Sequence, residues 1–145
     1  MRAVIDLMWW QLPVLPTAAG AARRHVRQTL TEWHLTAHSD DAQLIVSELV
    51  TNATRAAAIP HPRPTPDEPH PRLDVIHLGL FRSNTGLVIE VWDGNPGNPI
   101  LTPTRTDDEN GRGLHIVKAL TTQWGIRRPP SGGKVVWCEL PTPPP

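Results

Sequence analysis

A polar face on one predicted helix is the first feature of the sequence that could do chemistry. Glu48, Asn52 and Arg55 stand at positions i, i+4 and i+7, so an α-helix would place their side chains on one face. A carboxylate and a carboxamide one helical turn apart can hold Mg²⁺ and position or deprotonate a nucleophile. The alternative interpretation of the same residues is an ordinary solvated helix face.

A carboxylate at the end of a predicted strand is the second such feature. The apolar residues of 87–91 alternate with others, so in a strand they would share one face, and Asp93 would continue that row. A carboxylate at the mouth of an apolar pocket can accept a hydrogen bond from an exocyclic amine such as that of adenine. The alternative is an Asx-turn that leads into Gly94-Asn95-Pro96.

A glycine-rich helix start is the third feature of the sequence that could do chemistry. Gly111-Arg112-Gly113 comes directly before a helix predicted to begin at Leu114. Glycines there let the backbone approach a ligand, and a helix N-terminus offers free N–H groups and a positive dipole end to phosphates. A Walker A loop is absent, because Gly133-Lys134 is followed by Val135 and not by Ser or Thr. The dinucleotide-binding pattern is also absent, because no G-x-G-x-x-G follows a predicted strand. The three features together predict a nucleotide site without a P-loop.

Periodicity and turn residues predict the elements that must position these groups. We expect helices at residues 18–33, 41–58 and 114–121, and strands at residues 73–81, 87–93, 124–128 and 134–140. Residues 1–16 could be an edge strand or a flexible tail, and both remain open. The order of elements predicts an α+β fold, a two-layer sandwich with helices on one face of a mixed, mostly antiparallel sheet.

Apolar spacing also predicts which helix residues face the core. The first helix would bury Ala22, Val26, Leu30 and Trp33 behind a solvated outer face of Arg23, Arg24 and Arg27. In the second helix, Asp40 and Gln43 fit a capping box. The core residues expected for this second helix are Leu44, Ile45, Leu49 and Ala53.

Composition limits the class of protein. The 145 residues fit one ordinary domain, and 14 Lys+Arg balance 14 Asp+Glu, which argues against the broad basic field of a nucleic-acid binder. The single cysteine, Cys138, excludes an internal disulfide and a Cys-rich zinc site. No apolar stretch is long enough to span a membrane and the first residues do not form a secretory signal, so we expect a soluble, cytoplasmic protein.

The 17 prolines divide the chain, because each fixes φ and removes an N–H donor. We expect a strand or tail at residues 1–17, a single domain at 18–140 and a Pro-rich tail at 141–145. Within the domain, a Pro-rich loop would occupy residues 60–72.

Three segments resemble sequence boxes of the Bergerat-fold (GHKL) ATPases. Residues 48–53 (ELVTNA) look like the N-box, residues 91–96 (VWDGNP) like the adenine-binding box, and residues 111–117 (GRGLHIV) like the second glycine box. Residues 124–125 (WG) and 132–137 (GGKVVW) resemble the closing hairpin of one branch. That branch is the small anti-sigma-factor serine/threonine kinase-like proteins of actinobacteria, which have a histidine kinase-like ATPase domain.

The resemblance implies a role for each matching residue. Asn52 would coordinate the Mg²⁺ that bridges the ATP phosphates, Glu48 would be the general base, and Asp93 would bind the adenine amino group. Residues 96–110 would form the ATP lid. The implied ATP site comprises Asn52, Asp93, Gly94, Gly111, Arg112, Gly113 and Leu114, with Arg55 and Lys134 as candidate additional contacts, Lys134 to a phosphate.

The resemblance further implies an ATP-binding regulator of transcription that binds a sigma factor and phosphorylates Ser or Thr of a small antagonist protein. It implies no direct contact with nucleic acid or membrane, and it leaves a homodimer open.

Some positions depart from the family pattern. Val135 stands where many relatives have Thr, Ala56 follows Arg55 where His is frequent, and Glu109-Asn110 replaces an Arg of some kinases, so that Arg112 or Arg105 would have to substitute. These changes affect kinase activity more than ATP binding. A non-catalytic nucleotide-binding module is therefore the alternative, and a histidine-kinase catalytic domain, which would need a phosphoacceptor helix pair upstream, is a weaker one.

Overall fold

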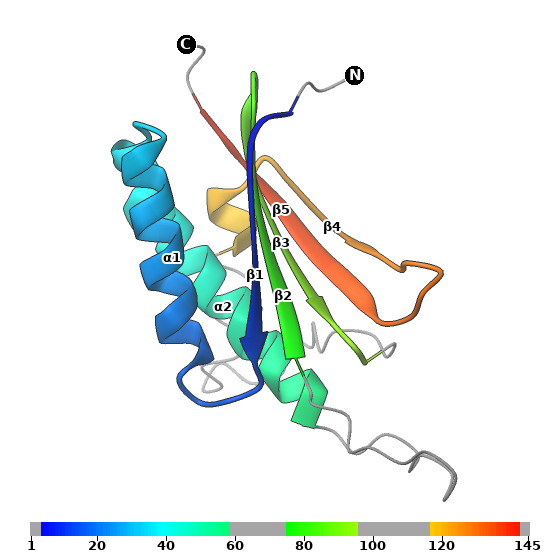
Figure 1. Ribbon diagram of the computed structural model, residues 1–145. Helices are drawn as coiled ribbons and strands as arrows, with labels where there is room; N and C mark the ends of the chain where they lie inside the picture. The colour runs from blue at the N-terminus through cyan, green and yellow to red at the C-terminus, as the bar shows by residue number, and fades with distance from the viewer. Residues whose placement is uncertain (1–3, 59–74, 96–116, 143–145) are drawn as a thin grey trace, which may run out of the picture.

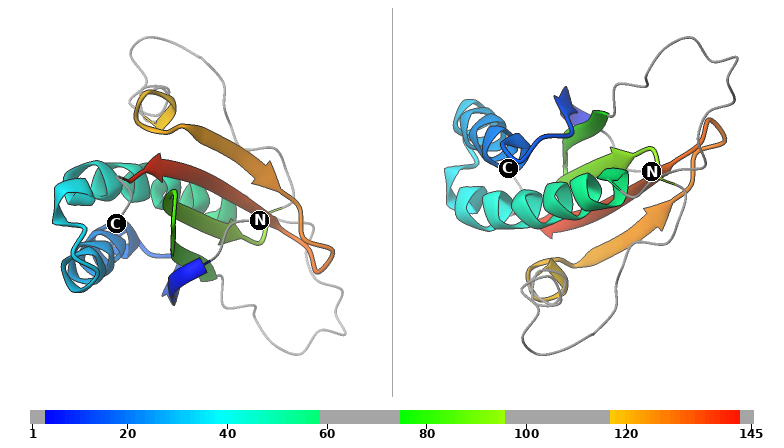
Figure 2. Two further views of the ribbon diagram at one scale, coloured as in Figure 1. Left: turned by 90° about the horizontal axis from the view of Figure 1, so that it is seen from above. Right: turned by 90° about the horizontal axis from the view of Figure 1, so that it is seen from below.

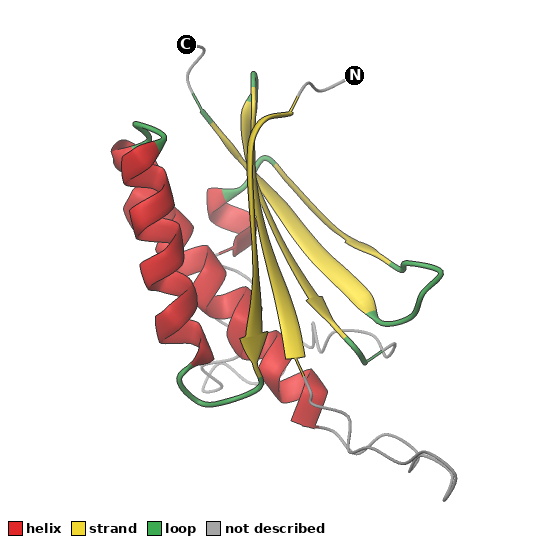
Figure 3. Ribbon diagram, viewed as in Figure 1, coloured by secondary structure: helices red, strands yellow, loops and turns green. Residues whose placement is uncertain are grey.

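The computed structural model describes residues 4–58, 75–95 and 117–142, and these form two layers, with helices on one face of a single sheet (Figures 1 and 3). The strand order is β1-β2-β3-β5-β4, and each of the four pairings is antiparallel. The α+β prediction is confirmed; the described sheet is antiparallel throughout, where a mixed sheet was expected. The elements are β1 (Val4–Pro13), α1 (Ala18–Glu32), η1 (Thr36–His38), α2 (Ser39–Ala58), β2 (Val75–Ser83), β3 (Gly86–Asp93), β4 (Gln123–Arg127) and β5 (Lys134–Pro141), and residues 117–120 are also helical.

The first strand settles the choice between an edge strand and a tail. β1 pairs with β2 along its length, from Val4 opposite Ser83 to Pro13 opposite Val75. Its inward side chains hold it to the helix layer, because Trp10 stacks on His25 of α1 with ring centroids 5.1 Å apart. Several other apolar side chains of β1 are exposed: Val4, Ile5, Leu7, Met8 and Trp9.

The helix layer is held by an apolar stripe on each helix. Ala22, Val26 and Leu30 of α1 are fully buried, as their spacing predicts, and Trp33 packs against the core just beyond the helix end. α1 lies beside β1, whereas α2 crosses the centre of the sheet over β2 and β3 (Figure 2).

Two predictions for α2 are wrong. Leu44 is 40% exposed, whereas the buried residues of α2 are Ala42, Ile45, Val46, Leu49, Val50, Ala53 and Ala57. The reason is that α2 contacts both α1 and the sheet, so it buries a wide arc opposite Leu44. The helix also begins at Ser39, so Gln43 Nε2 donates to Ser39 Oγ at 2.9 Å and no capping box with Asp40 forms.

Apolar residues of three central strands complete the core. The row predicted for β3 is confirmed, since Leu87, Ile89 and Val91 are at most 1% exposed. Their partners across the strand pairs are also buried: Leu78, Leu80, Cys138 and Leu140. No helix in residues 4–58, 75–95 or 117–142 is long and apolar enough to cross a membrane.

The opposite face of the sheet carries one cross-strand row in which each of two tryptophans lies beside a glycine. Trp9 lies opposite Gly79 and Trp137 opposite Gly125, and Glu90 stands between these pairs. A Cβ added at Gly79 would come within 3.1 Å of the Trp9 ring, and one at Gly125 within 2.9 Å of the Trp137 ring. The glycines therefore provide the space in which the two indoles pack.

Burial of Cys138 predicts an unreactive thiol. Loss of solvent raises the pKa of Cys138 to about 12, so at pH 8 the folded protein holds it as the protonated thiol, which is a poor nucleophile. We expect no reaction with an aromatic disulfide reagent at pH 8, and one equivalent of reaction in denaturant, where the thiol regains its ordinary pKa. Fast labelling of the folded protein would contradict the burial of Cys138 in the core.

Candidate functional site

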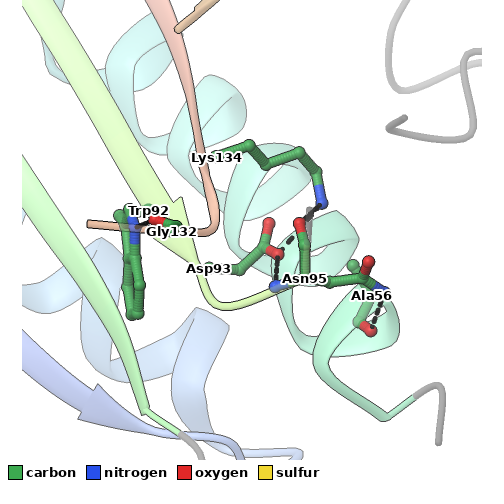
Figure 4. A network of polar contacts seen from close by, with 6 residues as sticks. All are labelled: Ala56, Trp92, Asp93, Asn95, Gly132 and Lys134. Carbon is green, nitrogen blue, oxygen red and sulfur yellow. Dashed lines mark hydrogen bonds and ion pairs between the residues drawn. The ribbon is translucent and has the colours of Figure 1, made fainter. Parts of the chain in front are cut away.

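An ion pair joins the end of β3 to the start of β5. Asp93 and Lys134 stand opposite each other in the strand register, and Lys134 Nζ lies 2.9 Å from Asp93 Oδ1 (Figure 4). Each side chain is only 2% exposed. Two charges removed from water to this degree require a partner of opposite charge, which each provides for the other.

A short turn after β3 completes the pairing. Asp93 Oδ1 also accepts a hydrogen bond from the backbone N–H of Asn95 at 2.8 Å, which is the Asx-turn considered as an alternative for Asp93. Lys134 Nζ donates a second hydrogen bond to the Asn95 carbonyl oxygen at 2.9 Å. The three residues thus form a closed ring of hydrogen bonds.

One carboxylate oxygen of Asp93 takes no part in this ring. Both contacts to the carboxylate use Oδ1, and Oδ2 accepts no hydrogen bond from any residue that the structure describes (Figure 4). The Asx-turn and a role in binding a donor group are therefore compatible, because they use different oxygens of the same side chain.

The polar face of α2 leads to this ring. Glu48, Asn52 and Ala56 follow one another at intervals of four residues, so they lie on one helix face with about 5.4 Å per turn. The Ala56 carbonyl oxygen accepts a hydrogen bond from Asn95 Nδ2 at 2.8 Å. Asn52 is thus one turn from a residue that contacts the ring directly, and Glu48 is two turns away. Both side chains are partly buried, whereas Arg55 is exposed.

The turn between β4 and β5 leads directly into Lys134 and requires glycine at position 133. Gly133 has a φ of +74°, and a Cβ there would overlap the carbonyl oxygen of Asp93. Trp92 Nε1 donates to the Gly132 carbonyl oxygen at 3.1 Å and fixes the turn from the other side. Gly132 also has a positive φ, +108°, but a Cβ there would meet open space.

Several predicted site residues lie outside the described residues. These are Gly111, Arg112, Gly113 and Leu114, together with the lid at 96–110 and the Pro-rich loop at 60–72. Their roles stay predictions. The structure does bring Asn52, Asp93 and Lys134 to one end of the sandwich, with Glu48 further along the same face of α2 and Gly94 exposed beside Asp93.

Sequence reasoning missed the pairing of Lys134 with Asp93 and the part played by Asn95. The signal was present, because the predicted strands 87–93 and 134–140 have opposite charges at the two ends that antiparallel pairing brings together. Using it required knowing that these two strands are neighbours. Periodicity within a strand does not contain that information.

The described residues offer a limited set of metal ligands. They contain no group of three or more His, Cys, Asp or Glu side chains that could hold a metal ion. A divalent ion at Asn52 would therefore need most of its ligands from a bound molecule or from water. Mg²⁺ commonly binds in this way, through one or two protein ligands plus phosphate oxygens.

Comparison with known families matches residues 12–139 to the histidine kinase-like ATPase domain. A comparison with curated proteins found no match. The matched range includes α1, α2, all of β2 to β4, and most of β5.

Substitutions in the turn before Lys134 should separate backbone strain from steric overlap. We expect Gly133→Ala to lower the free energy of unfolding by about 3 kcal/mol, because the methyl group displaces Asp93 or Trp92 in addition to straining φ. Gly132→Ala is the matched control and should cost about 1 kcal/mol, from backbone strain alone. Urea denaturation of both variants measures the difference. Equal losses would show that contact with Asp93 does not restrict residue 133.

Proposed function

Because this chain belongs to the histidine kinase-like ATPase domain family, we propose that it binds ATP at the end of the sandwich where Asp93 lies. The observation that carries the proposal is a buried carboxylate with one oxygen left over for a donor group. A carboxylate on a side chain that is only 2% exposed is a strong acceptor, and its hydrogen bond to an amine is charge-assisted. Asp93 Oδ2 would accept this bond from the adenine amino group.

The phosphates would lie along α2. Asn52 would supply an amide oxygen to Mg²⁺, and this donor fits a metal that is otherwise held by phosphate and water. Gly111, Gly113 and the backbone N–H groups around Arg112 and Leu114 would hold phosphate oxygens, as a helix start does. When bound, Mg·ATP supplies a transferable γ-phosphoryl group whose charge the metal partly neutralises.

Glu48 would act on the group that receives the phosphoryl. It lies one turn before Asn52 on the same face of α2, so a hydroxyl brought to the phosphate can also reach its carboxylate. Glu48 would hold that hydroxyl in place and accept its proton. Positioning and charge neutralisation would supply most of the rate enhancement.

The receiving hydroxyl, in this proposal, belongs to a Ser or Thr of a small antagonist protein, and the chain would also bind a sigma factor. The closing hairpin supports this assignment, since residues 124–125 and 132–137 resemble those of anti-sigma-factor kinases. The formal net charge of zero also favours protein partners over nucleic acid. The chain would thus be a cytoplasmic, ATP-dependent regulator of transcription.

A second candidate is a nucleotide-binding module without transferase activity. Two observations favour it: Glu109-Asn110 replaces the Arg that some kinases of this type have, and Val135 stands where many relatives have Thr. Both candidates share ATP binding. They differ in phosphoryl transfer, which can be measured separately.

Replacement of Glu48 should separate binding from transfer. We expect Glu48→Gln to bind ATP within about twofold of the wild type and to lower the transfer rate at least ~100-fold, because the amide cannot accept the proton. Calorimetry measures binding, and [γ-³²P]ATP with candidate antagonist proteins measures transfer. Transfer at the wild-type rate would rule out Glu48 as the base, and no transfer by the wild type to any of these proteins would favour the binding module.

Replacement of Asn52 tests the metal ligand. We expect Asn52→Ala to lose the part of ATP affinity that depends on Mg²⁺, roughly 10-fold or more, and to abolish transfer. Leu44→Ala is the control on the same helix, since Leu44 is exposed and lies two turns before Asn52, and it should keep the wild-type dependence of ATP affinity on Mg²⁺. If Mg²⁺ raises the ATP affinity of the Asn52 variant as much as it raises that of the wild type, Asn52 does not hold the ion.

A further inference from the structure

We propose that Lys134 is a base-specificity residue: its ammonium donates a hydrogen bond to the ring nitrogen beside the amino group that Asp93 binds. The pair Asp93–Lys134 would thereby recognise an amine donor and a ring-nitrogen acceptor that lie side by side, as in adenine. The inference rests on the proposed ATP binding, and it replaces the phosphate contact expected for Lys134 by a contact to the base.

The ammonium of Lys134 has a donor to spare. It carries three N–H donors. Two of them are used by Asp93 Oδ1 and the Asn95 carbonyl oxygen, both at 2.9 Å, and no residue that the structure describes accepts the third (Figure 4). A buried ammonium with an unused donor is a binding group that only an incoming acceptor can satisfy.

The matching acceptor is on the same ion pair. Asp93 Oδ2 accepts no hydrogen bond within the described part of the chain. An acceptor and a donor therefore lie next to each other, joined through Asp93 Oδ1. Adenine offers its amino N–H and its N1 lone pair in the same side-by-side order, so both protein groups are satisfied at once.

The reverse order would be rejected. Guanine places a carbonyl oxygen and a ring N–H where adenine has the amine and N1. The carboxylate would then face an oxygen and the ammonium would face an N–H group, so each close contact would be repulsive. The ion pair would thus exclude guanine through both of its members.

The charge balance explains why the base is favoured over a phosphate. Asp93 neutralises Lys134 at 2.9 Å, so the pair presents no net positive charge to an anion. The pair is also rigid, since Gly133, the Asn95 carbonyl oxygen and the register of β3 with β5 all fix Lys134. A rigid, neutral, donor-and-acceptor pair suits an uncharged aromatic ring.

The test compares three nucleotides on the wild-type protein by calorimetry. The nucleotides are ATP, 1-deaza-ATP, in which C–H replaces the N1 acceptor, and 7-deaza-ATP, a control changed at the far edge of the base. We expect 1-deaza-ATP to bind about 10-fold more weakly than ATP, and 7-deaza-ATP to bind like ATP. Equal affinities for ATP and 1-deaza-ATP would overturn the inference and leave ATP binding intact. Absence of binding by ATP itself would overturn the proposed function as well.

A variant then assigns the effect to Lys134. In Lys134→Met, which keeps the length and removes the donors, the ratio of the ATP and 1-deaza-ATP affinities should fall from about 10 to about 1. If the Met variant does not fold, Lys134→Gln is the second variant. Its side chain is shorter than that of Lys, and its amide still offers Asp93 an N–H donor. A wild-type ratio in the folded variant would show that Lys134 has only a structural role.

Discussion

The ion pair between Asp93 and Lys134 is the interaction on which the geometry of this end of the molecule depends. Breaking a buried pair by removing one partner costs about 3–5 kcal/mol, because the other charge stays buried and unpaired. β3 and β5 must therefore keep the register that places residue 93 opposite residue 134. The same constraint requires glycine at position 133, where the backbone of Asp93 leaves no room for a side chain.

The pair also connects two parts of the site that come from different layers. As proposed, base recognition would belong to the strand ends, and metal binding and proton acceptance would belong to α2. Asn95 joins them, because its backbone takes part in the ring with Lys134 and its side chain donates to Ala56. Departures from the family pattern can therefore affect phosphoryl transfer while the base contacts remain, and loss of one activity need not imply loss of the other.

Much of the fold could be predicted from the sequence, because its signals are local. Spacing along α1 and alternation along β3 identify Val26, Leu30, Ile89 and Val91 as buried, and the structure buries all four. The error at Leu44 has a physical cause: periodicity shows that a helix has an apolar side, but α2 packs against two neighbours and buries a wider arc than a simple stripe indicates. The pairing of Lys134 with Asp93 could not be predicted in the same way, since it depends on which strands are adjacent.

The position of β1 has a consequence for the order of folding during synthesis. β1 is made before its partner β2, so Val4 must wait for Ser83 to be translated. At about 5–20 residues per second this delay lasts several seconds. During that time the exposed apolar side chains of Ile5, Leu7 and Trp9 have no sheet to join, whereas α1 and α2 can already pack together. The nascent chain should therefore need protection at β1 more than at the end of the sandwich where Asp93 and Lys134 pair.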